Sequence, residues 1–135
     1  MSIDLPHHQI LYVSRIASGY RRDVFMSICH VSRHRNAELA VTGALLFDGR
    51  RFCQLLQGPA RNVKALMTRI AIDPRHDGLI VLFDDPIGCG AGEQSWCFAD
   101  CQDQALETLH AADGPRGEPA AMKFRHLLAC SPQWS

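Results

Sequence analysis

The chain has 135 residues, 47% of them hydrophobic and 21% charged, so it can bury a core and is not a disordered segment. Its 14 basic and 14 acidic side chains cancel, which argues against a general nucleic-acid-binding protein. No apolar run approaches the roughly 18 residues that span a bilayer, and the start MSIDLPHHQ lacks the features of a signal peptide. We therefore expect a cytoplasmic protein that binds neither membrane nor nucleic acid.

The first half of the chain predicts the order strand, helix, strand, strand. Residues 9–15 (QILYVSR) are typical of a strand, and residues 21–36 carry apolar positions at helical spacing. Residues 41–47 (VTGALLF) predict the second strand. The Asp-Gly pair that follows tolerates the positive φ angles of a tight hairpin turn, so residues 51–57 (RFCQLLQ) form the returning strand.

The second half continues with helix, strand, strand. Proline suits the first turn of a helix, so one begins after Gly58-Pro59 and carries an apolar stripe until DPRHDG ends it. LIVLF (79–83) and QSWCFA (94–99) predict two more strands around a glycine-rich loop. The order β-α-β-β-α-β-β predicts a ferredoxin-like α+β sandwich with both helices on one sheet face and the first and third strands adjacent at its centre.

Gln54 stands in the middle of the third predicted strand. It shares a face with Phe52 and Leu56, so its amide enters the core if that face is buried. The structural interpretation is a hydrogen-bonded core glutamine or a half-exposed strand. In the predicted topology Tyr12 and Gln54 lie on adjacent central strands, and both can face the helices.

The tail differs from the rest of the chain. Residues 103–111 predict a short helix, 113–119 (DGPRGEP) a linker and 120–130 another helix. Either this tail or another subunit must cover the second sheet face. We divide the chain into a domain over residues 8–100 and a C-terminal helical extension over 101–135 that packs on the sheet or mediates association. The side chains concerned are Leu11, Val13, Cys53 and Leu55 on the sheet, and Phe124, Leu127 and Leu128 in the tail.

The chain contains six cysteines, and nothing in the sequence points to secretion. Cys89, Cys97 and Cys101 with His110 are a conceivable zinc set, but no C-x-x-C pair supports it. We expect no metal site and free, mostly buried thiols.

Four segments in order carry a resemblance to a known family. They are LYVSR (11–15), RNAELAVTG (35–43), FCQLLQGP (52–59) and RIAIDPRH (69–76). With these motifs the chain resembles the BLUF family of blue-light sensors that use flavin, over roughly residues 8–100. The resemblance implies bound FAD or FMN between the two helices.

The resemblance assigns a switch to Tyr12, Gln54 and Trp96. Tyr12 would give an electron and then a proton to the excited flavin through Gln54, whose amide can both donate and accept hydrogen bonds. Trp96 resembles the family's mobile tryptophan, with a buried core tryptophan as the alternative. The resemblance also implies a set of cofactor contacts, namely Ser14, Asn36, Gln54, Arg69, Asp73, Arg75 and His76.

Structural alternatives stay open for most of these contacts. Asn36 could be a helix cap, Ser14 an ordinary strand serine, and Asp73 the cap of the DPRH turn. Arg69 and Arg75 could be solvated surface arginines. His76 is preferred for a contact to the flavin ring or its ribityl chain.

The chain departs from the family pattern at three places. Phe98 stands where methionine is usual, GCGAGEQSW replaces a segment that commonly holds an arginine-phenylalanine pair, and Gln57 replaces a glutamate. The first two alter the fifth strand, so they put the output and the photocycle speed in question more than flavin binding.

Taken together, the sequence predicts a short BLUF photoreceptor for signal transduction that is not an enzyme and has no effector domain. We expect it to act through a homo-oligomer or a separate effector protein. The alternative is a flavin-binding or protein-interaction module with lost or altered photoresponse. A ferredoxin-like enzyme of the acylphosphatase kind is a third interpretation, for which SRIASGYRR offers a weak anion-binding loop.

Overall fold

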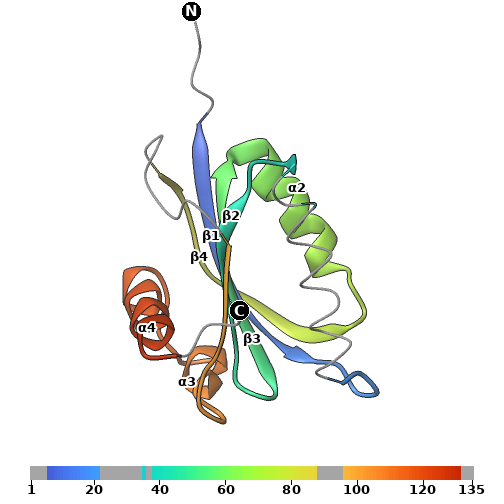
Figure 1. Cartoon of the computed structure of the whole chain (residues 1–135), viewed down its shortest axis with the longest axis vertical. Helices are drawn as coiled ribbons and strands as arrows, with labels where there is room; N and C mark the ends of the chain where they lie inside the picture. Colours follow the sequence, from blue (N-terminus) through green and yellow to red (C-terminus); the bar gives the residue numbers. More distant parts are fainter. Residues whose placement is uncertain (1–5, 22–34, 36–37, 88–95, 132–135) are drawn as a thin grey trace, which may run out of the picture.

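The computed structural model describes residues 6–21, 35, 38–87 and 96–131. A five-stranded sheet stands between helix α2 on one side and helices α3 and α4 on the other (Figure 1). The predicted helix over 21–36 lies almost entirely outside the described residues. The strands are β1 (His7–Ile16), β2 (Thr42–Phe47), β3 (Arg51–Pro59), β4 (His76–Ile87) and β5 (Trp96–Asp100), and the helices are α2 (Ala60–Ala71), α3 (Glu107–His110) and α4 (Glu118–Ala129).

The strand order is β4-β1-β3-β2-β5. β1 lies between β3 and β4 and is antiparallel to both, β2 is antiparallel to β3, and β5 runs parallel to β2. The predicted ferredoxin-like arrangement, with the first and third strands adjacent at the centre, is confirmed. The register pairs Tyr12 directly with Gln54, and this pairing builds the site described below.

Helix α2 covers one face of β1 and β3. The backbone N–H of Ala60 donates to the carbonyl of Pro6 (2.9 Å), which fixes the start of the helix beside the start of β1. The apolar stripe predicted from the sequence is the buried side of this helix. The cluster on this face contains Ile10, Tyr12, Val41, Leu56, Val63, Leu66 and Met67.

Helices α3 and α4 cover the opposite face. Two backbone donors fasten them to the sheet: Leu106 N–H donates to the carboxylate of Asp48 (3.0 Å) and Gly117 N–H to the carbonyl of Leu82 (2.7 Å). Asp48 is only 2% exposed, so this link is shielded from water. The cluster on this face contains Leu11, Val13, Ala44, Leu46, Cys53, Leu55, Leu82, Ala99, Leu106, Leu109, Ala120 and Phe124, with Leu127 and Leu128 packed against it.

Three predicted boundaries are wrong. The helix expected over 103–111 is reduced to Glu107–His110, because Gln104 has a left-handed φ of 62° that interrupts helical geometry. The linker expected over 113–119 already contains the start of α4, with Pro119 in its first turn, where proline fits. β4 begins at His76, inside the expected turn, because its first residues pair with the end of β1.

In the part of the chain that the structure describes, every helix is too short or too polar to cross a lipid bilayer.

Candidate functional site

The site is built around Tyr12 and Gln54, which face each other across β1 and β3. The Tyr12 hydroxyl donates a hydrogen bond to Oε1 of Gln54. Tyr12 is 5% and Gln54 9% exposed, and both lie on the face that α2 covers. The hydrogen bond therefore lies in a low-dielectric environment, where it is stronger than in water.

The amide nitrogen of Gln54 has no hydrogen-bond partner among the described residues. A buried amide donor left unsatisfied costs about 1–3 kcal/mol. The fold therefore presents an inward-facing donor next to a tyrosine hydroxyl, and a ligand with a hydrogen-bond acceptor would satisfy it. The polar edge of a flavin ring offers such acceptors, so the residues present fit the cofactor that the resemblance implies.

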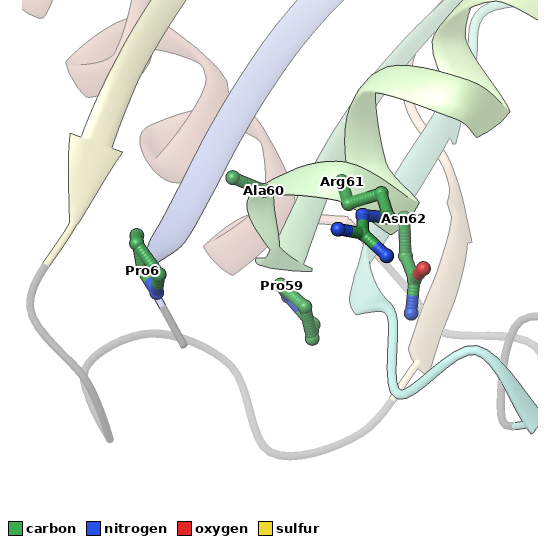
Figure 2. Close-up of a pocket in the computed structure, with 5 residues that line it drawn as sticks. All are labelled: Pro6, Pro59, Ala60, Arg61 and Asn62. Atoms are coloured by element: carbon green, nitrogen blue, oxygen red, sulfur yellow. The ribbon is translucent and has the colours of Figure 1, made fainter. Parts of the chain in front are cut away.

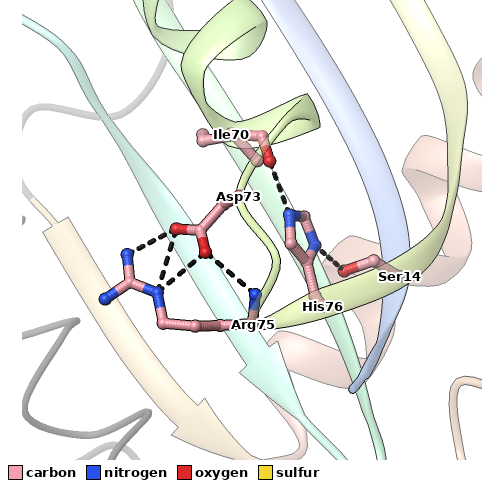
Figure 3. A network of polar contacts seen from close by, with 5 residues as sticks. All are labelled: Ser14, Ile70, Asp73, Arg75 and His76. Atoms are coloured by element: carbon pink, nitrogen blue, oxygen red, sulfur yellow. Dashed lines mark hydrogen bonds and ion pairs between the residues drawn. The ribbon is translucent and has the colours of Figure 1, made fainter. Parts of the chain in front are cut away.

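A second set of polar contacts, centred on His76, lies near the C-terminal end of β1 (Figure 3). One ring nitrogen of His76 (Nδ1) lies 2.7 Å from Oγ of Ser14, and the other (Nε2) lies 2.6 Å from the carbonyl oxygen of Ile70 at the end of α2. The centroids of the His76 and Tyr12 rings lie 6.2 Å apart, with 59° between the ring planes. His76 thus joins the end of α2 to β1, and it contacts β1 at Ser14, two residues after Tyr12.

Asp73 and Arg75 bind each other in the turn between α2 and β4 (Figure 3). The guanidinium Nε of Arg75 donates to both carboxylate oxygens of Asp73 (2.8 and 3.0 Å), and the backbone N–H of Arg75 donates to Oδ1 (3.0 Å). These bonds hold the pKa of Asp73 below its usual range, against the opposing effect of burial. This geometry favours the turn-capping interpretation of Asp73.

Of the other predicted site residues, the structure describes Arg69 fully, Trp96 in its backbone only and Asn36 not at all. Arg69 is exposed in the last turn of α2. Trp96 begins β5 with its backbone paired to Gly43, but its side chain lies outside the described part of the structure. Asn36 also lies outside it. Phe98, one of the departures from the family pattern, packs against the cluster on the face that α2 covers.

Two polar contacts were not predicted. The Ser14–His76 bond joins residues that were each assigned to the cofactor, and the only signal in the sequence was that Ser14 shares a strand face with Tyr12. Gln57, noted as a departure from the family pattern, donates through Nε2 to Oε1 of Gln9 (3.2 Å), and both residues are buried. The alternation of side chains along β3 could have placed Gln57 opposite to Gln54.

The described cysteines 53, 101 and 130 are free thiols. Burial raises the pKa of the Cys101 thiol to about 11 and that of Cys53 further. No group of three or more metal-binding side chains occurs among the described residues. The side chains of Cys89 and Cys97, two members of the conceivable zinc set, lie outside them.

A small hollow of about 280 Å³ lies at the start of α2, where β1 begins and β3 ends (Figure 2). Its lining is mostly apolar and includes none of the residues assigned to the switch or the cofactor. The lining residues are Pro6, Pro59, Ala60, Arg61 and Asn62.

The fold and the buried Tyr12–Gln54 pair define a ferredoxin-like ligand-binding domain. The sequence model of the BLUF family, described as sensors of blue-light using FAD, matches residues 8–91. The chain belongs to the BLUF family. The flavin implied by the sequence motifs is the cofactor of that family.

Similar proteins include larger light-regulated ones. The blue light- and temperature-regulated antirepressor BluF of Escherichia coli is 36% identical over 76 residues, which are 56% of this chain and 19% of that protein. Subunit beta of the photoactivated adenylate cyclase of Euglena longa is 29% identical over 100 residues, 74% of this chain and 12% of that one. The chain thus spans less than a fifth of these relatives.

A solved structure covers nearly the whole chain. The dark-state structure of BlrB, a BLUF protein, superposes with a TM-score of 0.76 at 22% identity, over 95% of this chain and 98% of that one. This likeness shows the fold, including its helical tail.

Proposed function

We propose that this chain is a blue-light receptor in which Tyr12 and Gln54 form the light-driven switch. The bound flavin supplies the absorption of blue light and the acceptor for an electron. Tyr12 would give up an electron and then its hydroxyl proton to that acceptor, and Gln54 would relay the proton between them. The supporting observation is the buried hydrogen bond between Tyr12 and Gln54, which leaves the Gln54 amide nitrogen without a partner among the described residues.

Glutamine suits this role because its hydrogen bonding can be reversed. In this structure Oε1 of Gln54 accepts from Tyr12, so the amide nitrogen is not used by that bond. Rearrangement of the amide exchanges donor and acceptor, so the same side chain can then donate toward Tyr12 and accept from the other side. A carboxylate could only accept and a leucine could do neither.

The remaining assignments form part of the proposal. Residues 8–100 are the flavin-binding domain, and 101–135 are an extension that packs on the sheet or mediates association. The chain is a sensor without enzymatic activity of its own, located in the cytoplasm, that signals through a homo-oligomer or a separate effector protein. FAD or FMN is held by contacts from Asn36, His76, Ser14, Arg69, Asp73 and Arg75, and Trp96 on β5 belongs to the switch.

The test is a light-minus-dark spectrum of the purified, flavin-loaded protein. We expect a small, reversible red shift of the flavin absorption in the wild type. Tyr12→Phe and Gln54→Leu should still bind flavin, since each loses only bonds worth about 1 kcal/mol, but neither should show the shift.

Gln57→Leu is the matched control. Gln57 is also a buried glutamine of β3, but strand alternation places it on the other face from Gln54, where it bonds to Gln9. It should therefore keep the red shift. A normal shift in Gln54→Leu would show that Gln54 only fills the core, and a flavin-bound wild type without a shift would indicate a binding module that has lost its light response.

A further inference from the structure

The Ser14–His76–Ile70 chain fixes which atom carries each hydrogen. The carbonyl of Ile70 can only accept, so Nε2 of His76, at 2.6 Å, must carry a hydrogen. In the neutral ring Nδ1 is then an acceptor, and the Ser14 hydroxyl at 2.7 Å must donate to it. Ser14 is fully buried, so water does not compete for this hydroxyl.

Protonation of the ring reverses the Ser14 bond but not the Ile70 bond. With both ring nitrogens protonated, Nδ1 becomes a donor and Ser14 Oγ must accept. The single Ser14 hydroxyl proton then turns toward another acceptor. In the neutral state, Ser14 therefore presents only lone pairs to its surroundings; in the protonated state, it presents a donor.

From this geometry we infer that Ser14 is a second reversible hydrogen-bonding group beside the Tyr12–Gln54 pair, and that the protonation state of His76 sets the direction of its hydroxyl. His76 is in this sense a positioning residue. Ser14 lies two residues from Tyr12 on the same face of β1, and the His76 ring lies against the Tyr12 ring. The inference rests on the proposed light-sensing function.

Charged groups around His76 come from each neighbouring element. The Asp73–Arg75 pair lies in the turn before β4, and positive charge on His76 adds to the lowering of the pKa of Asp73 that the Arg75 hydrogen bonds dominate. Arg69 is in the last turn of α2, whose C-terminal end favours a cation. On the strand side, Arg15 of β1 and Asp77 of β4 form an ion pair at 3.0 Å.

The first test observes His76 without using light. ¹⁵N NMR of the histidine ring in the flavin-loaded protein in the dark should show the Nε2–H tautomer when the ring is neutral and hydrogens on both nitrogens when it is protonated. An Nδ1–H tautomer at high pH would overturn the inference, because Ser14 would then accept in both states.

The second test follows the dark recovery of the red shift from about pH 5.5 to about pH 8.5. The wild-type recovery rate should change about fivefold, which is the effect of one ordinary hydrogen bond. Ser14→Ala, measured on the flavin-loaded fraction of the protein, should lose this pH dependence, because the hydroxyl whose direction changes is gone. His76→Gln, which keeps an amide donor for Ile70, should lose it as well.

His110→Gln is the matched control. His110 also bridges two groups, accepting at Nδ1 from Arg51 Nε (3.1 Å) and donating from Nε2 to the Gly78 carbonyl (2.7 Å), but it belongs to α3 on the opposite side of the sheet. It should keep the wild-type pH dependence. A pH-independent recovery in the wild type, or a pH dependence that survives in Ser14→Ala, overturns the inference while the light-sensing function stands. A wild type without any red shift overturns the function itself.

Discussion

Asp73 makes the stability of the turn before β4 depend on pH. Hydrogen bonds from Arg75 are the main cause of its lowered pKa. Because the folded-state pKa lies below the unfolded value of about 3.9, the stabilisation is present above that value and is lost as the pH falls through the folded-state pKa. Asp73→Asn should therefore lower the free energy of unfolding by about 1 kcal/mol near pH 7 and by much less once the pH falls below the folded-state pKa, measured by urea denaturation.

Asp77→Asn provides the comparison for Asp73. Asp77 also pairs with an arginine, Arg15, but about half of its side chain is exposed. Solvent screening makes such a pair worth little, so we expect a smaller loss at neutral pH. An Asp73 effect that is unchanged at acid pH would contradict the role of its charge.

The sequence predicts some of the site residues and their partners, but not all. Strand alternation and the ferredoxin-like order are enough to bring Tyr12 and Gln54 onto adjacent strands and the same face. The Ser14–His76 bond was not predictable, because it depends on β4 beginning at His76 and on α2 ending with the carbonyl of Ile70 within reach. Both boundaries are set by tertiary pairing and not by local propensity.

At the scale of elements, Asp48 joins the β2–β3 hairpin to the start of the tail. Its carboxylate accepts from the backbone N–H groups of Arg50 (3.0 Å), Arg51 (2.6 Å) and Leu106 (3.0 Å). Asp48→Ala leaves these donors without their acceptor at a buried position, so we expect a loss of about 1–3 kcal/mol in the free energy of unfolding, measured by urea denaturation.

Asp85→Asn is the control for the hairpin prediction, because Asp85 is exposed on β4. Its substitution should change stability by no more than about 0.5 kcal/mol. If Asp48→Ala is equally mild, the hairpin and α3 are held together by apolar packing alone.

The same residues explain which elements were predictable. The Asp-Gly turn and the two strands around it follow from local chemistry, and both strands were placed to within two residues. The length of α3 did not follow, because the left-handed Gln104 and the bond from Leu106 to Asp48 are imposed by the sheet. Nothing in the local sequence of 103–111 signals either feature.

At the scale of the whole molecule, the tail closes the face of the sheet opposite α2 (Figure 1). Deleting residues 113–135 removes α4 and should expose the apolar cluster beneath it, which promotes association or insolubility. Size-exclusion chromatography with a thermal melt measures the effect. A monodisperse truncated protein with an unchanged Tm would show that α4 contributes little to that face.

Two single substitutions within α4 test whether its buried side chains, and not only the presence of the helix, stabilise the protein. Phe124 is 1% exposed and Met122 is 62% exposed. Phe124→Ala should cost about 3–5 kcal/mol by leaving a cavity, whereas Met122→Ala should be nearly neutral. Equal effects would place the tail contact elsewhere on the helix.

The position of β1 between β3 and β4 has a consequence for how the chain is made. β1 leaves the ribosome before the other strands, and its two partners begin only at Arg51 and His76, and α4 only at Glu118. At roughly 5–20 residues per second, the apolar side chains of β1 wait for seconds without a neighbouring strand. The central strand can therefore join the sheet only after β3 and β4 have followed it out of the ribosome.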